Sequence, residues 1–263
     1  MMLKRMGTSA ALCALLTMVA VPVAQAADDN LLQKIKERGI MRICDVDYAP
    51  WNVKNPATNQ WEGINVDLLT EVAAMLKVKF EHVDATWATL IPNMTTGKCD
   101  FSGAGLYISP ARAQQVTFTR PFATDGIALF VPANSTAKTP EDLDESGKTI
   151  VVRSGSYEEG LAKRIFKHAT VKTLTADQAG IVTLEIASGR ADAGAGGYYG
   201  NLAFLKANKN VKVRVLSDDL LSRTSIAYAV PPGEYFFRDW LNAVILNMEE
   251  NGKLKEVLAK WSN

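Results

Sequence analysis

An arginine stands in an unusual place in the segment from Gly103 to Phe122, GAGLYISPARAQQVTFTRPF. Ser109 and Pro110 have the residue types of a helix N-cap and first helical position, so Arg112 is expected in the first turn of a helix. That end of a helix carries unpaired N–H groups and the positive pole of the helix dipole, which disfavour a cation unless an anion is present. The segment therefore predicts either an anion-binding site or an ion pair between Arg112 and an acid of its own chain.

A second helix start in the other half of the chain has a similar character. Gly155, Ser156 and Tyr157 precede a helical segment expected over 158–166. Backbone amides at a helix N-terminus bind carboxylates, and a serine hydroxyl adds a donor. Ser156 and Glu159 also fit an ordinary capping box, which is compatible with ligand binding by the remaining amides.

The residue types needed for catalysis are sparse. His82 and His168 are the two histidines of the chain, and no His and Cys residues have the spacing of metal ligands. The segment Gly103 to Gly105 lacks the full pattern of a dinucleotide-binding loop. The sequence therefore predicts no catalytic residue, no metal site and no cofactor.

The elements that must position these residues alternate between strands and helices. Strands are expected over 41–45, 80–83, 101–106 and 149–153, and helices over 65–76, 87–94, 235–250 and 253–261. A turn with glycine, a basic residue and an aspartate precedes a strand in each half, at Gly97 to Asp100 and at Gly189 to Asp192. We expect an α/β fold in two units, each with a mainly parallel sheet flanked by helices, whose strand C-termini face a shared cleft.

Two apolar extended stretches, 125–131 and 224–230, are candidates for the connections between the units. Pro231 to Gly233 then breaks the chain, and the two C-terminal helices are expected to pack back on the first unit. The predicted boundaries are 27–125 with 226–263 for lobe 1, and 126–225 for lobe 2.

The first 26 residues have the pattern of an export signal. Lys4 and Arg5 precede a mostly apolar stretch that ends in Ala24-Gln25-Ala26, a typical cleavage site. Cleavage would leave 237 of the 263 residues, with 27 basic and 28 acidic residues and a net charge of −1. A nearly neutral chain without a basic cluster is not expected to bind nucleic acid or an anionic membrane.

Two cysteines remain after the predicted cleavage, Cys44 and Cys99. Export permits a disulfide without requiring one. Both residues lie in apolar, strand-like surroundings that are typical of buried thiols, and we expect them to be unpaired.

Several motifs occur together in an order that is specific. They are Tyr48 to Trp51 (YAPW), Gly63 to Leu68 (GINVDL), Trp87 to Pro92 (WATLIP), Gly97 to Asp100 (GKCD), Ser109 to Ala113 (SPARA) and Phe118 to Phe122 (FTRPF). With these motifs the chain resembles the family 3 extracellular solute-binding proteins, the periplasmic components of polar amino-acid ABC importers. The resemblance covers essentially all of the chain after residue 26.

The resemblance implies a two-lobed type II periplasmic-binding-protein fold and assigns roles to residues. Arg112 matches an arginine that binds the α-carboxylate of the ligand through a bidentate, charge-assisted contact. Gly105 and Tyr107 match ligand-lining positions, although the family often has serine or threonine at position 107. Tyr48 and Trp87 also match positions that line the ligand.

The second lobe has one match and one departure. The start at Gly155, Ser156 and Tyr157 matches the family's glycine-threonine pair. Gly197 stands where members that bind α-amino acids usually have an aspartate for the α-ammonium group. Either another acid such as Asp45 or Asp47 compensates, or the ligand has no α-ammonium.

Three further aromatic residues, Trp51, Tyr198 and Tyr199, are more typical of core or rim packing.

The resemblance implies a monomeric periplasmic protein that captures one small carboxylate-bearing solute between two lobes and presents it to a membrane permease. The alternative is a periplasmic enzyme on the same scaffold, such as a dehydratase acting on cyclic carboxylates. A receptor-type binder that signals through a membrane partner is a third possibility.

Overall fold

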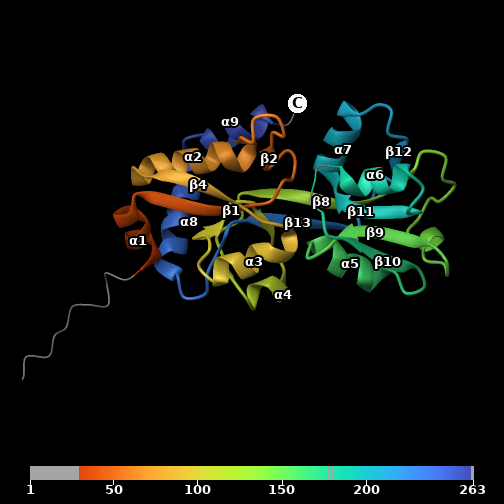
Figure 1. The fold of residues 1–263 in the computed structure, drawn as a ribbon, viewed down its shortest axis with the longest axis horizontal. Coiled ribbons are helices and arrows are strands. Elements are labelled where there is room, and N and C mark those ends of the chain that lie inside the picture. The colour runs from red at the N-terminus through yellow and green to blue at the C-terminus, as the bar shows by residue number, and fades with distance from the viewer. Residues whose placement is uncertain (1–29, 177, 179, 262–263) are drawn as a thin grey trace, which may run out of the picture.

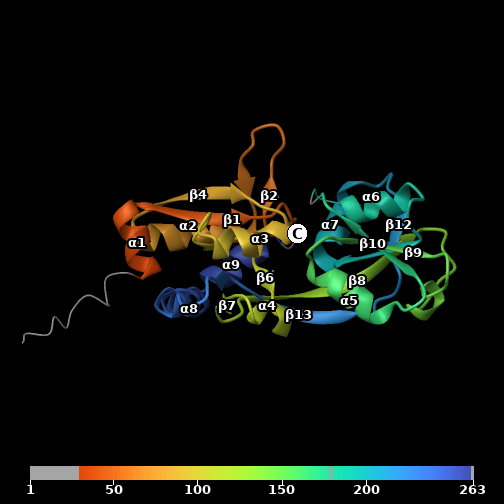
Figure 2. The same cartoon turned by 60° about the horizontal axis from the view of Figure 1, so that its bottom comes forward.

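Helices and strands alternate along the chain and gather into two lobes (Figure 1). The computed structural model describes residues 30–176, 178 and 180–261, so the predicted signal peptide lies outside the described residues. Two strands, β8 (Ala123–Pro132) and β13 (Ser222–Ala227), run side by side between the lobes (Figures 1 and 2).

Lobe 1 is built on a parallel sheet with the strand order β4-β1-β5. Its middle strand is fully buried at Met41 and Ile43, because helices pack on both faces of the sheet (Figure 1). The elements of lobe 1 are α1 (Leu31–Arg38), β1 (Ile40–Asp45), β2 (Val53–Lys54), β3 (Trp61–Glu62), α2 (Ile64–Leu76), β4 (Lys79–Asp84), α3 (Trp87–Thr95), β5 (Phe101–Ser102), β6 (Leu106–Tyr107), α4 (Pro110–Ala113), β7 (Thr117–Phe118), β14 (Ala229–Val230), α8 (Tyr235–Glu250) and α9 (Lys253–Lys260).

The apolar spacing of the sequence determines how the helices of lobe 1 pack. In α2 the buried residues Leu68, Leu69 and Val72 recur at helical spacing and face the core. Thr86 begins α3 with a capping box that it forms with Thr89, so Trp87 becomes the first helical residue. The helix also accommodates Pro92.

Lobe 2 has a sheet in which β10, β9 and β11 are parallel neighbours. Helix α5 packs against this part of the sheet, and α6 and α7 lie on the opposite face (Figure 1). The remaining elements of lobe 2 are a 3₁₀ turn (Glu141–Leu143), β9 (Thr149–Arg153), α5 (Tyr157–Ile165), β10 (Thr170–Leu174), α6 (Ile181–Ala187), β11 (Ala193–Gly197), α7 (Tyr198–Ala207) and β12 (Val213–Val215).

The crossing strands β8 and β13 run antiparallel to the strands they pair with. Strand β8 pairs antiparallel with β11, β12 and β13, and β13 pairs antiparallel with β6 of lobe 1. The prediction of parallel strands therefore holds for the lobe 1 sheet and for the strands β9 to β11. The two crossings add an antiparallel half to the sheet of lobe 2.

Cys44 and Cys99 form a disulfide, so the expectation of unpaired thiols is wrong. Cys44 belongs to β1, and Cys99 lies just before β5, the strand that pairs with β1 through Cys44 and Ser102. The parallel pairing of the two strands brings the thiols together. The strand-like character of each cysteine's surroundings does not reveal this pairing.

The C-terminal helices pack on lobe 1, which confirms the prediction for this part of the chain. Helix α9 lies against α2, and the Trp261 indole N–H donates to the Asp67 carboxylate over 2.8 Å. Helix α8 contacts α1. Within the described residues, no helix has the length and apolar character needed to cross a membrane.

Candidate functional site

Arg112 lies where the two lobes meet. Ser109 caps the four-residue helix α4, and its hydroxyl accepts from the Arg112 backbone N–H over 3.3 Å, as predicted. The guanidinium is buried and donates to the Tyr107 carbonyl over 3.1 Å and to the Gly155 carbonyl of lobe 2 over 3.3 Å. Arg112 therefore contacts both walls of the junction.

The acceptors of Arg112 are neutral. Among the described residues its hydrogen bonds go to two carbonyl oxygens, whereas a guanidinium has five N–H donors. Burial lowers the pKa of Arg112, and the charge of Glu158 acts in the opposite direction. A buried cation bonded only to neutral carbonyls is a strong candidate for binding a carboxylate.

The opposite wall is the start of α5. Gly155 has a φ of 74°, and a β-carbon there would come within 2.5 Å of the Ala88 Cα of lobe 1. Ser156 caps the helix by accepting from the Glu159 N–H over 3.2 Å. The Glu159 carboxylate accepts from the Gly155 N–H, one residue earlier than a standard capping box predicts. A glycine is needed here because the backbones of the two lobes approach closely.

Aromatic side chains from both lobes surround this contact. The Tyr48 and Trp87 rings pack edge to face with centroids 5.7 Å apart, and the Tyr107 and Tyr157 rings do so at 5.8 Å. The Tyr48 and Tyr107 hydroxyl oxygens lie 3.2 Å apart. The structure thus brings together the four aromatic residues predicted for the site.

Gly197 ends β11 directly against these hydroxyls. A β-carbon at this position would lie 1.6 Å from the Tyr48 hydroxyl oxygen and 2.7 Å from that of Tyr107. The space next to Gly197 is therefore occupied by two neutral hydroxyls, since burial raises the pKa of both tyrosines. In this conformation no side chain larger than that of glycine fits at position 197.

Asp125 is a site residue that the sequence analysis did not identify. Its carboxylate accepts from the Tyr107 hydroxyl over 2.7 Å and from the Gly126 N–H over 2.7 Å. Burial raises the pKa of Asp125 to about 6, although hydrogen bonds from Tyr107, Gly126 and the Tyr199 backbone lower it. Asp125 lies on the crossing strand β8. From its sequence position it was interpreted as part of a connection between the lobes and not as a residue of the site.

Arg153 and Glu158 are two further charged residues of the site that the sequence analysis missed. Both are buried, and the Arg153 Nη2 lies 3.7 Å from the Glu158 Oε1. The Arg153 Cζ lies 4.5 Å from the Tyr48 ring centroid and 5.7 Å from that of Trp87. Arg153 could have been identified from the sequence. It ends the predicted strand 149–153, and ligands bind at the C-terminal edge of such sheets.

Asp45 and Gly105 lie in the interior of lobe 1. The Asp45 carboxylate is fully buried, accepts from the Asn52 side-chain amide over 2.7 Å and is bonded to His82. A β-carbon on Gly105 would point at Ile226, 2.9 Å away. The structure does not bring the Asp45 side chain into the cluster around Arg112.

The remaining aromatic candidates lie around the edge of the junction. Trp51 and the exposed Tyr199 line a separate groove of about 670 Å³. Tyr198 packs edge to face against Tyr199 and lies beside a cluster of buried apolar residues in lobe 2. These positions fit the rim and core packing expected for them.

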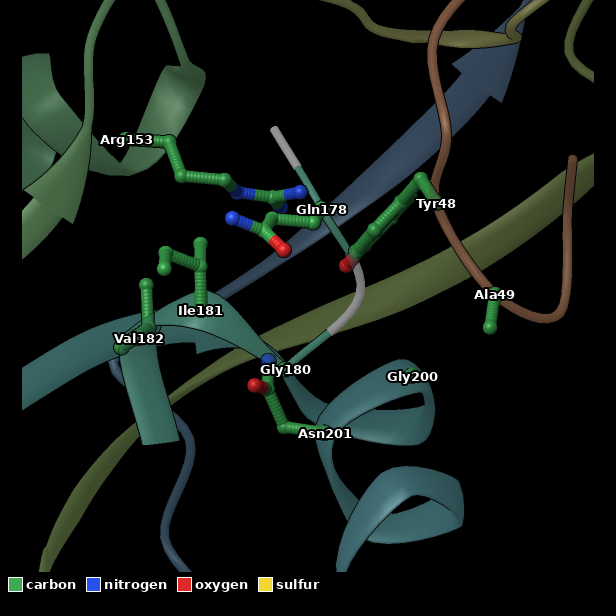
Figure 3. A pocket seen from close by; sticks show the side chains of 9 residues that line it. All are labelled: Tyr48, Ala49, Arg153, Gln178, Gly180, Ile181, Val182, Gly200 and Asn201. Carbon is green, nitrogen blue, oxygen red and sulfur yellow. The ribbon is translucent and has the colours of Figure 1, made fainter. Parts of the chain in front are cut away.

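The lobes are closed on one another in this structure. A cavity of about 20 Å³ remains at the junction, lined by Tyr48 and Ala49 of lobe 1 and by lobe 2 residues that include Arg153, Gln178 and Asn201 (Figure 3). Figure 3 shows the Arg153 side chain extending towards Tyr48 across the junction. Within the described part of the chain, no group of three His, Cys, Asp or Glu side chains is arranged to hold a metal ion.

Comparison with known proteins shows what the chain is similar to. ABC transporter arginine-binding protein 1 of Escherichia coli (strain K12) is 25% identical over 211 residues, covering 78% of this chain and 83% of that protein. Cyclohexadienyl dehydratase of Pseudomonas aeruginosa is 26% identical over 148 residues, 55% of each chain. A crystal structure of an ancestral amino-acid-binding protein, a precursor of cyclohexadienyl dehydratase, gives a TM-score of 0.80. That protein is 29% identical, and the match covers 88% of this chain and 99% of the other.

The family model agrees with the fold and the motifs. The model described as bacterial extracellular solute-binding proteins, family 3, matches residues 40–263. Two α/β lobes, two crossing strands and a buried arginine at their junction are thus found in a chain with the family's sequence pattern. The chain belongs to the bacterial extracellular solute-binding proteins of family 3.

Proposed function

We propose that the protein captures a small carboxylate-bearing solute, an amino acid or a related compound, between its lobes and delivers it to an ABC permease. The observation that carries this proposal is the buried Arg112 guanidinium, bonded to neutral carbonyls of both lobes. A ligand carboxylate would replace these carbonyls as a charged acceptor and would favour closure by touching both walls. The names of relatives support transport, because several are amino-acid-binding proteins of ABC transporters.

The proposed binding site consists of Arg112 with the backbone of Gly105 and Gly155, the Ser156 hydroxyl, and the rings of Tyr48, Trp87, Tyr107 and Tyr157. Asp125, Arg153, Glu158 and Gly197 complete it. Asp45 is left out because its carboxylate is bonded to Asn52 and His82. No residue of the set has a catalytic role in this proposal.

The proposed setting is the periplasm. Residues 1–26 direct export, 27–125 with 226–263 form lobe 1, and 126–225 form lobe 2. The protein acts as a monomer and uses neither metal nor cofactor. The membrane permease recognises the closed form.

A thermal-shift screen that pairs each amino acid with its keto or hydroxy acid tests the carboxylate proposal. The deaminated partner of the best ligand is also expected to stabilise the protein, because position 197 lacks the acid that usually holds the α-ammonium. Stabilisation by amino acids alone would refute this account of Gly197. Gly197→Asp is the matched variant. Its side chain requires the Tyr48 and Tyr107 hydroxyls to move, and it is expected to weaken binding of the plain acid more than binding of the amino acid.

A dehydratase is the second candidate function. The relative named cyclohexadienyl dehydratase and the buried Asp125, whose pKa of about 6 suits proton transfer near neutral pH, favour it. The two functions differ in what happens to the solute. A binding protein raises its melting temperature with a cyclic carboxylate and leaves the compound unchanged, whereas a dehydratase consumes it, which NMR of the mixture detects.

A further inference from the structure

We propose that Arg153 determines specificity by occupying the aromatic cage formed by Tyr48 and Trp87, which excludes solutes with a cationic side chain. This inference builds on the proposed function, because it names the class of solute that the same site rejects. It assigns a role to a residue of lobe 2 that acts on the wall of lobe 1.

The geometry is that of a cation bound by aromatic rings. The Arg153 Cζ lies 4.5 Å from the Tyr48 ring centroid and 5.7 Å from the Trp87 ring centroid. The two rings are nearly perpendicular, at 80°, and so form two sides of a corner. A guanidinium within about 6 Å of a tyrosine or tryptophan ring is attracted to it. The chain's own arginine therefore binds where the side chain of a cationic solute would bind.

The guanidinium is held in this position from its own lobe. Arg153 is the last residue of β9, and Glu158 lies in the first turn of α5, which follows that strand. Their charged atoms are 3.7 Å apart, and the two residues are 6% and 3% exposed. Buried charges are stable when paired, so Glu158 fixes the position of Arg153.

With Arg153 in the cage, little space remains beside it. The cavity of about 20 Å³ beside Tyr48, Arg153 and Asn201 has room for about one water molecule. A solute that ends in a guanidinium or ammonium group would meet a filled cage and a like charge. A neutral side chain of the same shape avoids the charge repulsion, so the arrangement discriminates by charge.

Arginine and citrulline form a suitable pair of probes, because citrulline replaces the guanidinium with a neutral urea of nearly the same shape. Isothermal titration of the wild type is expected to favour citrulline over arginine. Arg153→Ala empties the cage and should raise arginine affinity relative to citrulline by at least tenfold. Arg153→Lys keeps the cation and should retain the wild-type preference, as should Arg164→Ala, which removes an exposed arginine of α5.

Ethylguanidinium tests the cage without the carboxylate site. It carries the end of an arginine side chain and no carboxylate, so its binding is independent of Arg112. At millimolar concentration it is expected to raise the melting temperature of Arg153→Ala, but not of the wild type or of the double variant Tyr48→Ala/Arg153→Ala. If carboxylate capture were wrong but the cage correct, this stabilisation would persist while amino acids failed to bind.

Two results would overturn the proposal. One is an unchanged arginine-to-citrulline affinity ratio in Arg153→Ala, and the other is a folded Arg153→Ala that ethylguanidinium does not stabilise. Because Arg153→Ala leaves Glu158 buried without its partner, Arg153→Met/Glu158→Gln is the substitute if the single variant does not fold. The affinity ratio of the double variant must shift in the same direction for the proposal to stand.

Discussion

Two buried guanidinium groups face the junction of the lobes, and their partners differ. Arg153 is paired with the Glu158 carboxylate and packs on two aromatic rings. Arg112 donates to two backbone carbonyls. A ligand carboxylate would gain more by binding Arg112 than Arg153. At Arg112 it would replace neutral carbonyl acceptors, and a charge-assisted hydrogen bond is stronger than one to a neutral acceptor. We therefore propose Arg112 as the cation that binds the ligand carboxylate, and Arg153 as part of the wall around it.

The titration of Asp125 makes stability depend on pH. Its native pKa of about 6 lies above the ordinary value of 3.8, so the folded state binds the proton more tightly than the unfolded chain. The folded state is consequently favoured below pH 4, and this contribution is lost as the pH rises from 4 to 6. A shift of this size corresponds to about 3 kcal/mol.

Urea unfolding of the wild type and of Asp125→Asn at several pH values measures this effect. Asparagine keeps a carbonyl acceptor for the Tyr107 hydroxyl and does not titrate. The stability of the wild type relative to the variant is expected to fall between pH 4 and 6 and to level off above pH 7. A difference that rises with pH in this window would contradict the raised pKa.

The positions of the candidate site residues were predictable where a motif marks them and not where only the packing brings them together. Ser109 before Pro110 places Arg112, and the glycine of Gly155 to Tyr157 marks the close approach of the second wall. Asp125 and Glu158 read as polar residues of a strand and a helix. Their burial depends on which residues from the other lobe cover them, and periodicity within one segment does not contain that information.

Local patterns also predicted most elements. The sequence predicted α8 over 235–250 and β9 over 149–153 with the bounds that the structure has. The antiparallel direction of β8 was not predictable, because an apolar run fits either a parallel or an antiparallel neighbour. The disulfide was not predicted either, because it depends on which strands pair, here β1 with β5, and the apolar pattern of each segment does not determine that.

The bond between Cys44 and Cys99 should stabilise lobe 1. The two residues are 55 positions apart, and closing a loop of that length lowers the entropy of the unfolded chain. The chain-entropy model gives about 4 kcal/mol for such a loop. The double variant Cys44→Ala/Cys99→Ala is expected to lose a few kcal/mol in urea unfolding.

Reductant supplies the control for this prediction. Dithiothreitol should lower the stability of the wild type and leave the double variant unchanged. A wild type that is equally stable with and without reductant, after thiol titration has confirmed reduction, would show that the bond does not stabilise the fold.

Contacts between the two lobes hold the molecule in its closed form. The two crossing strands join the lobes (Figure 2), and Arg112, Arg153 and Gly155 make contacts between them. These contacts stabilise the closed form at the positions where a ligand is proposed to bind. A solute must therefore replace some of them, and its net gain over these contacts determines its affinity.

The affinity of Arg112 variants for the best solute of the thermal-shift screen measures whether the ligand carboxylate binds at Arg112. Isothermal titration is expected to show that Arg112→Ala weakens binding by far more than tenfold. Arg112→Lys should also bind poorly because lysine lacks the planar pair of donors, whereas Arg164→Ala should bind like the wild type. A loss of less than tenfold in Arg112→Ala, about 1.4 kcal/mol, would show that the carboxylate does not bind at Arg112.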